Sequence, residues 1–321
     1  MKMKRKIYFR ADASVSIGYG HFIRTLALAD MLKDDFDCTF FTCHPTPYQV
    51  DEMEKVCPFL ALREETHYDD FLSHLQGDEI AVLDNYFFDT GYQRAIKGKG
   101  CRLVCIDDMH DKHYVADVLI HHGFADASLF DCENYTVKCI GIDWAMLRRP
   151  FLKPLPETNQ RDQSIVICLG GSDSLRLTEK IATYLLNLGC DSPIKAIVGD
   201  KAVISEEIQN SIHVLSRLTA EEISELFRHS AYAILSASTV CIEALYSGIK
   251  VMVGYYIDNQ KDCYECLERK KMVAPLLFLP ELTEQTLEES ISKADEYTAP
   301  HYDATSIKTK YISLFKKLST L

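Results

Sequence analysis

Long apolar runs are missing from this sequence of 321 residues. No segment approaches the roughly 18 uninterrupted apolar residues of a membrane-spanning helix. The basic start, MKMKRKIYFRAD, looks like the beginning of a secretory leader, but Arg10 and Asp12 end its apolar run after three residues. A leader needs a longer apolar core, so the sequence predicts neither a leader nor a membrane span.

Positive charge is also scarce, since 35 Lys and Arg face 47 Asp and Glu, for a net charge of −12. Such a chain repels nucleic acid and anionic lipid surfaces, so neither is expected as a partner. The 12 cysteines are spread singly rather than in a disulfide framework. Reduced thiols of this kind are typical of the cytoplasm, which is the expected location.

Glycine and proline, with 14 and 10 residues, are too few for a collagen or a low-complexity chain. An apolar content of 47% is instead typical of a globular protein. Since a domain has about 150 residues, the length favours two domains.

Short, continuous apolar runs with helical segments between them fill the first half of the chain. They lie at residues 6–10, 38–43, 80–84, 102–107 and 117–121. Continuous rather than alternating apolarity predicts strands buried on both faces, and therefore a parallel sheet covered by helices. Residues 21–33 are apolar around most of a helix circumference, which predicts a largely buried helix.

A stretch rich in proline and polar residues, 149–163, predicts a linker. A second series follows, with strands at 164–169, 194–198, 212–215, 231–235 and 250–253, and helices at 175–188, 220–228 and 239–247. We therefore expect an α/β protein with two Rossmann-like domains, 1–150 and 151–321. The ligand would bind in the cleft between them, at the carboxyl ends of the strands. A last helix within 302–318 is expected to pack back on the first domain.

The segment RADASVSIGYGHFIR connects the first strand to the buried helix. Gly18 and Gly20 let a ligand approach the backbone, and free N–H groups at the helix start can bind an anion. A dinucleotide fingerprint would have a third glycine where Ile23 stands, so a nicotinamide cofactor is not expected. His21 lies at the positive end of the helix dipole, which favours the neutral imidazole that a general base requires. A helix-capping histidine is the simpler alternative, and Arg24 lies on the same face.

Two further strand-to-helix junctions can hold phosphate groups. In LGGSDSLRLTEK, Gly170 and Gly171 follow a strand and Asp173 can cap the next helix. In LSASTVCIEALYSG, the small residues 236–239 leave room for a diphosphate on helix N–H groups. Glu243 follows one turn later, where a carboxylate can accept both hydroxyls of a ribose. Tight turns and helix stabilisation explain these residues as well, so both interpretations stay open.

The segment DDMHDKH is the richest cluster of metal-ligating residue types in the chain. Its spacing matches no known ligand pattern, and acids after a parallel strand serve equally as substrate contacts or turn formers. We therefore expect no metal and no other cofactor.

Taken in order, the motifs RADAS, IGYGH with Arg24, VLDNY, CIDD, LGGSD, SASTVCIEAL and NQ resemble the UDP-sugar hydrolases of pseudaminic acid biosynthesis. The resemblance covers residues 6 to about 270. It implies the GT-B fold of glycosyltransferases such as MurG. It also implies an enzyme that hydrolyses a UDP-linked diacetamido-trideoxy sugar, releasing UDP with inversion at the anomeric carbon.

The same resemblance implies roles for individual residues. His21 is expected to activate water and Tyr86 to orient water or sugar, while Asn85 stands where the family often has histidine. Residues 236–238 and Glu243 are expected to hold the diphosphate and the ribose. The residues expected to bind substrate are Arg10, Asp12, Gly18, Gly20, Arg24, Asn85, Gly170, Gly171, Asp173, Ser236, Ala237, Ser238, Glu243, Asn259 and Gln260.

The reaction has alternatives on the same fold. A transferase would pass the sugar to an acceptor, and a 2-epimerase would isomerise the UDP-sugar. A binding protein would hold a nucleotide sugar without turnover. The motifs alone leave these three open.

Overall fold

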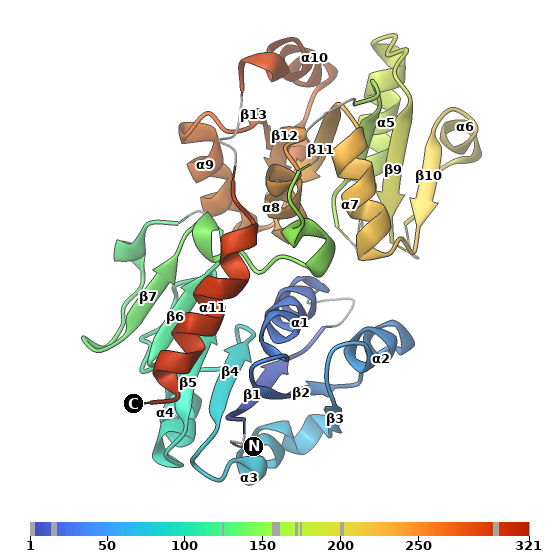
Figure 1. Cartoon of the computed structure of the whole chain (residues 1–321). Coiled ribbons are helices and arrows are strands. Elements are labelled where there is room, and N and C mark those ends of the chain that lie inside the picture. Colours follow the sequence, from blue (N-terminus) through green and yellow to red (C-terminus); the bar gives the residue numbers. More distant parts are fainter. Residues whose placement is uncertain are drawn as a thin grey trace. The chain divides into compact units, whose positions relative to one another are not determined.

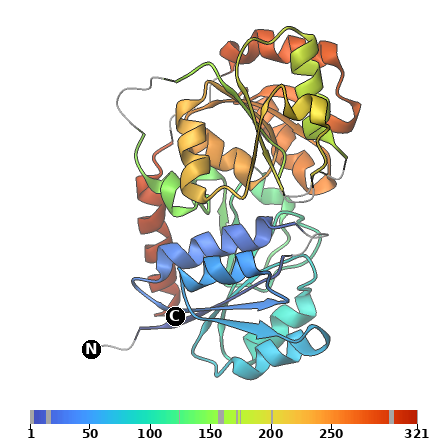
Figure 2. The same ribbon diagram turned by 90° about the vertical axis from the view of Figure 1, so that its right-hand side faces the viewer.

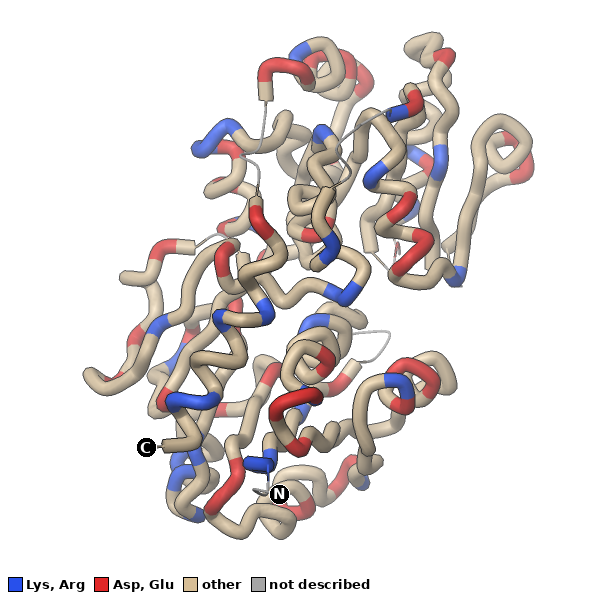
Figure 3. Tube along the Cα trace, in the orientation of Figure 1, with Lys and Arg blue, Asp and Glu red and all other residues tan. Residues whose placement is uncertain are grey.

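A computed structural model describes residues 4–13, 18–123, 125–155, 161–170, 173, 175–199, 202–297 and 302–320. The chain divides into two compact units (Figure 1). Unit 1 comprises Met1–Arg149 and Thr305–Leu321, and unit 2 comprises Pro150–Ala304. Acidic and basic residues occur in both units, as Figure 3 shows.

Unit 1 is built on a parallel sheet with the order β3-β2-β1-β4-β5-β6-β7. Its strands are β1 (Lys6–Ala11), β2 (Asp37–Cys43), β3 (Phe59–Leu62), β4 (Ile80–Asp84), β5 (Arg102–Ile106), β6 (Val118–His121) and β7 (Val137–Ile140). Its α-helices are α1 (Gly20–Leu32), α2 (Pro47–Glu54), α3 (His67–His74), α4 (Thr90–Gly98) and α11 (Thr305–Leu318). The continuous apolar runs thus form strands buried on both faces, as predicted.

Helices cover both faces of this sheet (Figure 2). Phe71 of α3 and Ile96 of α4 pack with Phe41 in one core cluster. Helix α1 covers the opposite face. The ring of its Phe22 packs against that of Phe40 of β2, with 5.6 Å between the ring centroids. Helix α11 contacts α1, which places the end of the chain in unit 1. Helix α1 is buried on most of its circumference, as its apolar sequence predicts.

Unit 2 repeats the design with the sheet order β10-β9-β8-β11-β12-β13. Its strands are β8 (Ile165–Cys168), β9 (Ile194–Val198), β10 (His213–Ser216), β11 (Tyr232–Ser236), β12 (Lys250–Tyr255) and β13 (Ala274–Phe278). Its α-helices are α5 (Leu177–Asn187), α6 (Glu206–Gln209), α7 (Ala220–His229), α8 (Thr239–Tyr246), α9 (Lys261–Arg269) and α10 (Glu284–Lys293). The strand pairs are again all parallel in the described residues.

The strand order reverses once in each sheet. In unit 1 the chain moves outward from β1 to β3 and then returns to place β4 on the other side of β1. In unit 2 it moves from β8 to β10 and returns to place β11 beside β8. In open α/β sheets, ligands bind outside the carboxyl ends of the strands at such a reversal. The β1–β4 and β8–β11 junctions are therefore the first places to look for sites.

The expected α/β class with parallel sheets is confirmed by this topology. Three strands that the apolar runs did not indicate, β3, β7 and β13, lie at the outer edges of the sheets. In the ranges that the structure describes, no helix combines the length and apolarity needed to cross a bilayer. The cleft expected between the two units stays a prediction.

Candidate active site

His21, in the first turn of α1, faces the carboxyl end of β4. Its Nδ1 lies 2.7 Å from Oδ1 of Asp84, the last residue of that strand. Nη2 of Arg24 also lies 3.0 Å from this nitrogen, but it donates to Oδ1 of Asp84 at the shorter distance of 2.6 Å. A bare ring nitrogen would set its lone pair against the carboxylate at 2.7 Å, so we assign the proton to Nδ1, which donates it to Asp84. In the neutral ring this leaves Nε2 as the basic atom. A carboxylate that fixes the tautomer of a histidine in this way is the usual support of a general base.

Asp84 is fully buried and accepts further hydrogen bonds from α1. Arg24 donates to both of its oxygens, from Nε at 2.7 Å and from Nη2 at 2.6 Å. Thr25 donates from Oγ1 at 2.7 Å. Burial alone would raise the pKa of Asp84, but Arg24 and His21 lower it by more, so this pKa lies below its usual value. Asp84 is therefore ionised at neutral pH, and His21 and Arg24 do share a helix face.

Arg24 extends this network to the ends of β5 and β6. Its Nη1 donates to Oδ2 of Asp108 at 2.8 Å and lies 3.5 Å from Nε2 of His122. Burial alone would raise the pKa of Asp108, but the Arg24 guanidinium lowers this pKa by more than burial raises it. The pKa of Asp108 therefore lies below its usual value. Burial, aided by Arg24, lowers the pKa of His122 to about 3. Arg24 is thus held between two carboxylates beside a neutral histidine.

The buried His122 predicts a pH-dependent stability. An unfolded histidine binds a proton below about pH 6.5, whereas folded His122 binds one only below about pH 3. Between these values the unfolded state binds more protons, so stability falls as the pH falls. Near pH 5, His122→Asn should reduce the slope of the unfolding free energy against pH by about 1.4 kcal/mol per pH unit.

Urea unfolding at several pH values measures this slope. The single tryptophan, Trp144, lies in unit 1, so its fluorescence reports on the unit that contains His122. His113→Asn is a suitable control. Asp131 and Glu133 raise the pKa of the half-buried His113, so this ring is protonated near pH 5 in both the folded and the unfolded state and adds no slope there. An unchanged slope in His122→Asn would show that His122 is protonated in the folded state.

Tyr86 lies beside the His21 ring, on the loop after β4. The two ring centroids are 4.6 Å apart, with the ring planes at 81°. Lys112 donates from Nζ to the carbonyl oxygen of Tyr86 at 2.9 Å and also lies 3.4 Å from Oδ2 of Asp107. The loop after β5 therefore holds the loop that carries Tyr86.

The predicted site residues of the loop after β1 contact residues at the carboxyl ends of β1 and β4. Arg10 is fully buried and forms two bonds to the Asp12 carboxylate, at 2.5 and 2.7 Å. The backbone N–H of Asp12 donates to Oδ1 of Asn85 at 2.7 Å. Gly18 has a φ of +81°, which glycine adopts without strain, and Gly20 begins α1. Arg10, Asp12 and Asn85 thus shape the loop through contacts with one another.

The acids of DDMHDKH are engaged with the protein itself. Oδ1 of Asp107 accepts from the backbone N–H groups of Met109 and His110, at 2.7 and 3.0 Å. Asp108 pairs with Arg24. Within the described ranges, no three His, Cys, Asp or Glu side chains are arranged to hold a metal ion.

In unit 2, the predicted segments follow the neighbouring strands β8, β11 and β12. The carbonyl oxygen of Leu169 accepts from the hydroxyl of Tyr256 at 2.8 Å and from Oγ of Ser236 at 3.4 Å. This carbonyl joins the ends of all three strands. Gly170 has a φ of +102°, a backbone conformation that residues with a side chain rarely adopt, so glycine fits there without strain.

The remaining predicted residues of unit 2 cap or surround these turns. Both carboxylate oxygens of Asp173 accept backbone N–H groups at the start of α5, from Leu177 and Thr178, each at 2.8 Å. Ser238 is the residue at the start of α8, and Gln260 accepts from the backbone of Tyr256 at 3.1 Å. The buried members of the set are Ser236, Ala237, Glu243 and Gln260. Asn259 is half-buried in the turn after β12, and Gly171 lies outside the described residues.

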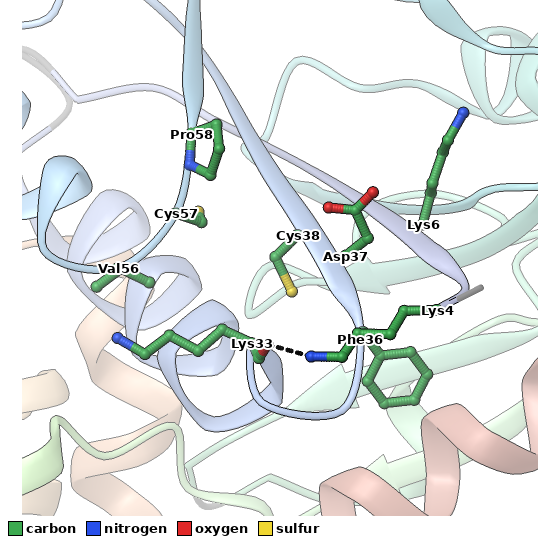
Figure 4. Close-up of a pocket in the computed structure, with 9 residues that line it drawn as sticks. All are labelled: Lys4, Lys6, Lys33, Phe36, Asp37, Cys38, Val56, Cys57 and Pro58. Carbon is green, nitrogen blue, oxygen red and sulfur yellow. Dashed lines mark hydrogen bonds between the residues drawn. The ribbon is translucent and has the colours of Figure 1, made fainter. Parts of the chain in front are cut away.

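A separate hollow lies at the amino-terminal ends of β1 and β2 in unit 1 (Figure 4). It has a volume of about 420 Å³ and is lined by Lys4, Lys6, Lys33, Phe36, Asp37, Cys38, Val56, Cys57 and Pro58. Lys6 and Asp37 begin their strands, whereas His21 and Asp84 lie at the carboxyl edge. The ammonium group of Lys4 donates to the backbone carbonyls of Lys33 and Asp34, at the end of α1, so it already has hydrogen-bond partners within the protein. The hollow contains none of the predicted site residues.

The sequence reasoning did not assign roles to Asp84, Asp108, Lys112 or His122. One signal for Asp84 was present. A helix predicted to be buried carried His21 and Arg24 on one face, and such polar groups need a buried partner. The acid that ends the apolar run 80–84 was the available carboxylate. Lys112 and His122 had no comparable signal, because their contacts depend on loop geometry.

Sequence comparisons give two relatives. The chain is 26% identical over 287 residues to the UDP-2,4-diacetamido-2,4,6-trideoxy-beta-L-altropyranose hydrolase of Campylobacter jejuni, which covers 83% of this chain and 97% of that protein. It is 26% identical over 283 residues to an uncharacterized protein of Methanocaldococcus jannaschii, where it covers 81% of this chain but spans only 57% of the relative. No protein-family model matches the chain.

Solved structures share the fold of the whole chain. MurG of Acinetobacter baumannii superposes with a TM-score of 0.64 at 14% identity, covering 98% of this chain and 99% of that one. Arabidopsis thaliana UGT89C1, solved with UDP, has a TM-score of 0.62 at 10% identity and covers 98% and 100%. The chain therefore has the GT-B-like fold of these glycosyltransferases, and its similarity to the Campylobacter hydrolase confirms the resemblance that the motifs indicated.

Proposed function

We propose that this protein hydrolyses a UDP-linked diacetamido-trideoxy sugar at the anomeric C–O bond. It releases UDP and the free sugar with inversion, as a step in making a pseudaminic-type nonulosonic acid. The similarity to the Campylobacter hydrolase supports this substrate class, and the fold is one that supports nucleotide-sugar chemistry.

The observation that carries the proposal is the His21–Asp84 pair beside Tyr86 at the β1–β4 reversal. A hydrolase that inverts in one step must activate water, and a neutral imidazole held by a carboxylate can do so. An acceptor hydroxyl needs the same base in a transferase, so the reaction products distinguish the two activities.

In the proposed step, Nε2 of His21 takes a proton from water while the water oxygen forms a bond to the anomeric carbon. The bond from that carbon to the UDP oxygen breaks, and its electron pair leaves with the diphosphate. Asp84 stabilises the imidazolium that forms, and the Arg24 contacts hold Asp84 in place. Attack on the face opposite to the leaving group inverts the anomeric configuration.

The nucleotide is assigned to unit 2, at the ends of β8, β11 and β12. Helix α8 begins there after the small residues Ser236, Ala237 and Ser238. The first backbone N–H groups of a helix lack partners within the helix and favour an anion. Gly170 and the turn that carries Asn259 and Gln260 flank this position. General-base assistance contributes about 10²- to 10⁴-fold, so stabilising the departing diphosphate must supply much of the rest.

Glu243 is expected to determine UDP affinity. With its carboxylate accepting ribose hydroxyls, Glu243→Gln should weaken UDP binding by about 10-fold, because a hydrogen bond to a charged acceptor is worth about 1–1.5 kcal/mol more than one to the neutral amide. Calorimetric titration with UDP measures the effect. Glu225→Gln, an exposed acid on α7, should bind UDP like the wild type. An unchanged affinity in Glu243→Gln would mean that this side chain only stabilises α8.

Product analysis tests the function itself. The purified protein is incubated in buffer with UDP-2,4-diacetamido-2,4,6-trideoxy-altrose, with or without sugar and lipid acceptors, and free UDP is measured. A hydrolase releases UDP equally in both conditions. A transferase releases it only with an acceptor, an epimerase yields an isomerised UDP-sugar, and a binding protein yields nothing.

A further inference from the structure

His67, the first residue of α3, contacts the buried Arg10 through its ring. Nδ1 of His67 lies 3.1 Å from Nη2 of Arg10. A guanidinium can only donate, so Nδ1 must be the acceptor. The proton of the neutral ring is then on Nε2. Because the Asp12 carboxylate holds Arg10 in place with two bonds, this tautomer is enforced by the protein.

The same surroundings keep the ring neutral. Burial, followed by the charge of Arg10, lowers the pKa of His67 below its usual value. Near neutral pH the ring therefore has one donor, Nε2–H. No other group among the described residues forms a hydrogen bond with this ring. The donor is available to a ligand.

Two partly exposed aromatic rings frame this donor. The ring centroid of Tyr68 lies 4.0 Å from that of His67, and the centroid of Phe87 lies 5.7 Å from it. Tyr68 and Phe87 are 37% and 36% exposed, so both offer apolar surface. Phe87 directly follows Tyr86, the residue that contacts His21. The donor and the Tyr68 ring thus come from the start of α3, and Phe87 comes from the loop after β4 that carries Tyr86.

An acetamido group has the complementary chemistry, because a carbonyl acceptor and a methyl group share one carbon. We propose that His67 is a specificity residue, which donates Nε2–H to the carbonyl oxygen of an acetamido group of the sugar while the methyl group packs against Phe87 and Tyr68. This inference rests on the proposed function and adds the feature that distinguishes acetamido sugars from hydroxyl sugars.

Binding of two matched ligands tests the proposal. One is the UDP-diacetamido sugar, and the other carries hydroxyls in place of both acetamido groups. His21→Asn protein is used throughout, so that neither ligand is consumed. His67→Phe removes the donor but keeps an aromatic ring, whereas His67→Gln keeps an N–H donor near the position of Nε2.

We expect His67→Phe to weaken the diacetamido ligand by about 5- to 10-fold, which is the value of one hydrogen bond. The affinities for the hydroxyl ligand and for UDP itself should change by less than about 2-fold. His67→Gln should recover most of the affinity lost for the diacetamido ligand. Equal losses on both sugars, or no loss on either, would overturn the proposal. Failure of the proposed function would show separately, as lack of turnover by the wild type, while this difference in binding persists.

Discussion

Asp84→Asn should lower kcat by about 10³- to 10⁴-fold while the protein still binds UDP. The asparagine amide can present an N–H to Nδ1 of His21, which favours the tautomer with its proton on Nε2. The basic atom would then point into the protein instead of toward water. Loss of the carboxylate that orients a catalytic histidine, with the site otherwise intact, lowers kcat by about this factor.

Asp108→Asn is the matched control for this variant. It also removes a carboxylate from Arg24, so each variant should lower the free energy of unfolding by about 3–5 kcal/mol. Asp108 does not contact His21, however, and kcat should fall by less than about 10-fold. Turnover is measured at saturating substrate, and UDP affinity is measured by titration. Equal losses of kcat in the two variants would mean that Asp84 acts only by holding Arg24.

His21→Asn should lower kcat by about 10²- to 10⁴-fold, because general-base assistance is lost while the substrate remains bound. UDP affinity should change little, since the nucleotide is assigned to unit 2. Steady-state UDP release at saturating substrate measures the loss of kcat, and titration with UDP measures the affinity.

His122→Asn is the control for His21→Asn. It removes a buried histidine of the same network that lies next to Arg24, whereas the histidine ring that contacts Tyr86 is that of His21. Its kcat should stay within about 3-fold of the wild type. If folded His21→Asn keeps wild-type turnover, another group activates the water and the assignment of the base is wrong.

Much of the fold could be predicted because central strands have a distinctive sequence. The runs 80–84 and 194–198 coincide with β4 and β9, since strands with both faces covered are apolar at most positions. The outer strand β7 has exposed residues such as Val137, and a mixed pattern of this kind does not stand out from a loop. The end of the chain could be expected to pack on the first domain only because its helix is amphipathic.

The candidate site was predicted less completely, for a physical reason. His21 and Arg24 could be selected because glycines, a helix start and polar groups on a buried helix coincide in one segment. Substrate binding by Arg10 stays a prediction, and in the structure its guanidinium contacts Asp12 and His67. His67 begins α3, and no local pattern indicates that the first residue of this helix contacts Phe87, which follows β4, a strand separated from β3 by β2 and β1 in the sheet.

Proton NMR of the wild-type protein with the UDP-diacetamido-trideoxy sugar, in buffer alone, tests the central claim most directly. The anomeric signals and free UDP are followed from the first turnovers, with His21→Asn alongside. We predict that UDP appears together with the sugar of opposite anomeric configuration, and that the variant is slower by at least about 100-fold. Release of the retained anomer first, or no release without an acceptor, would contradict an inverting hydrolase.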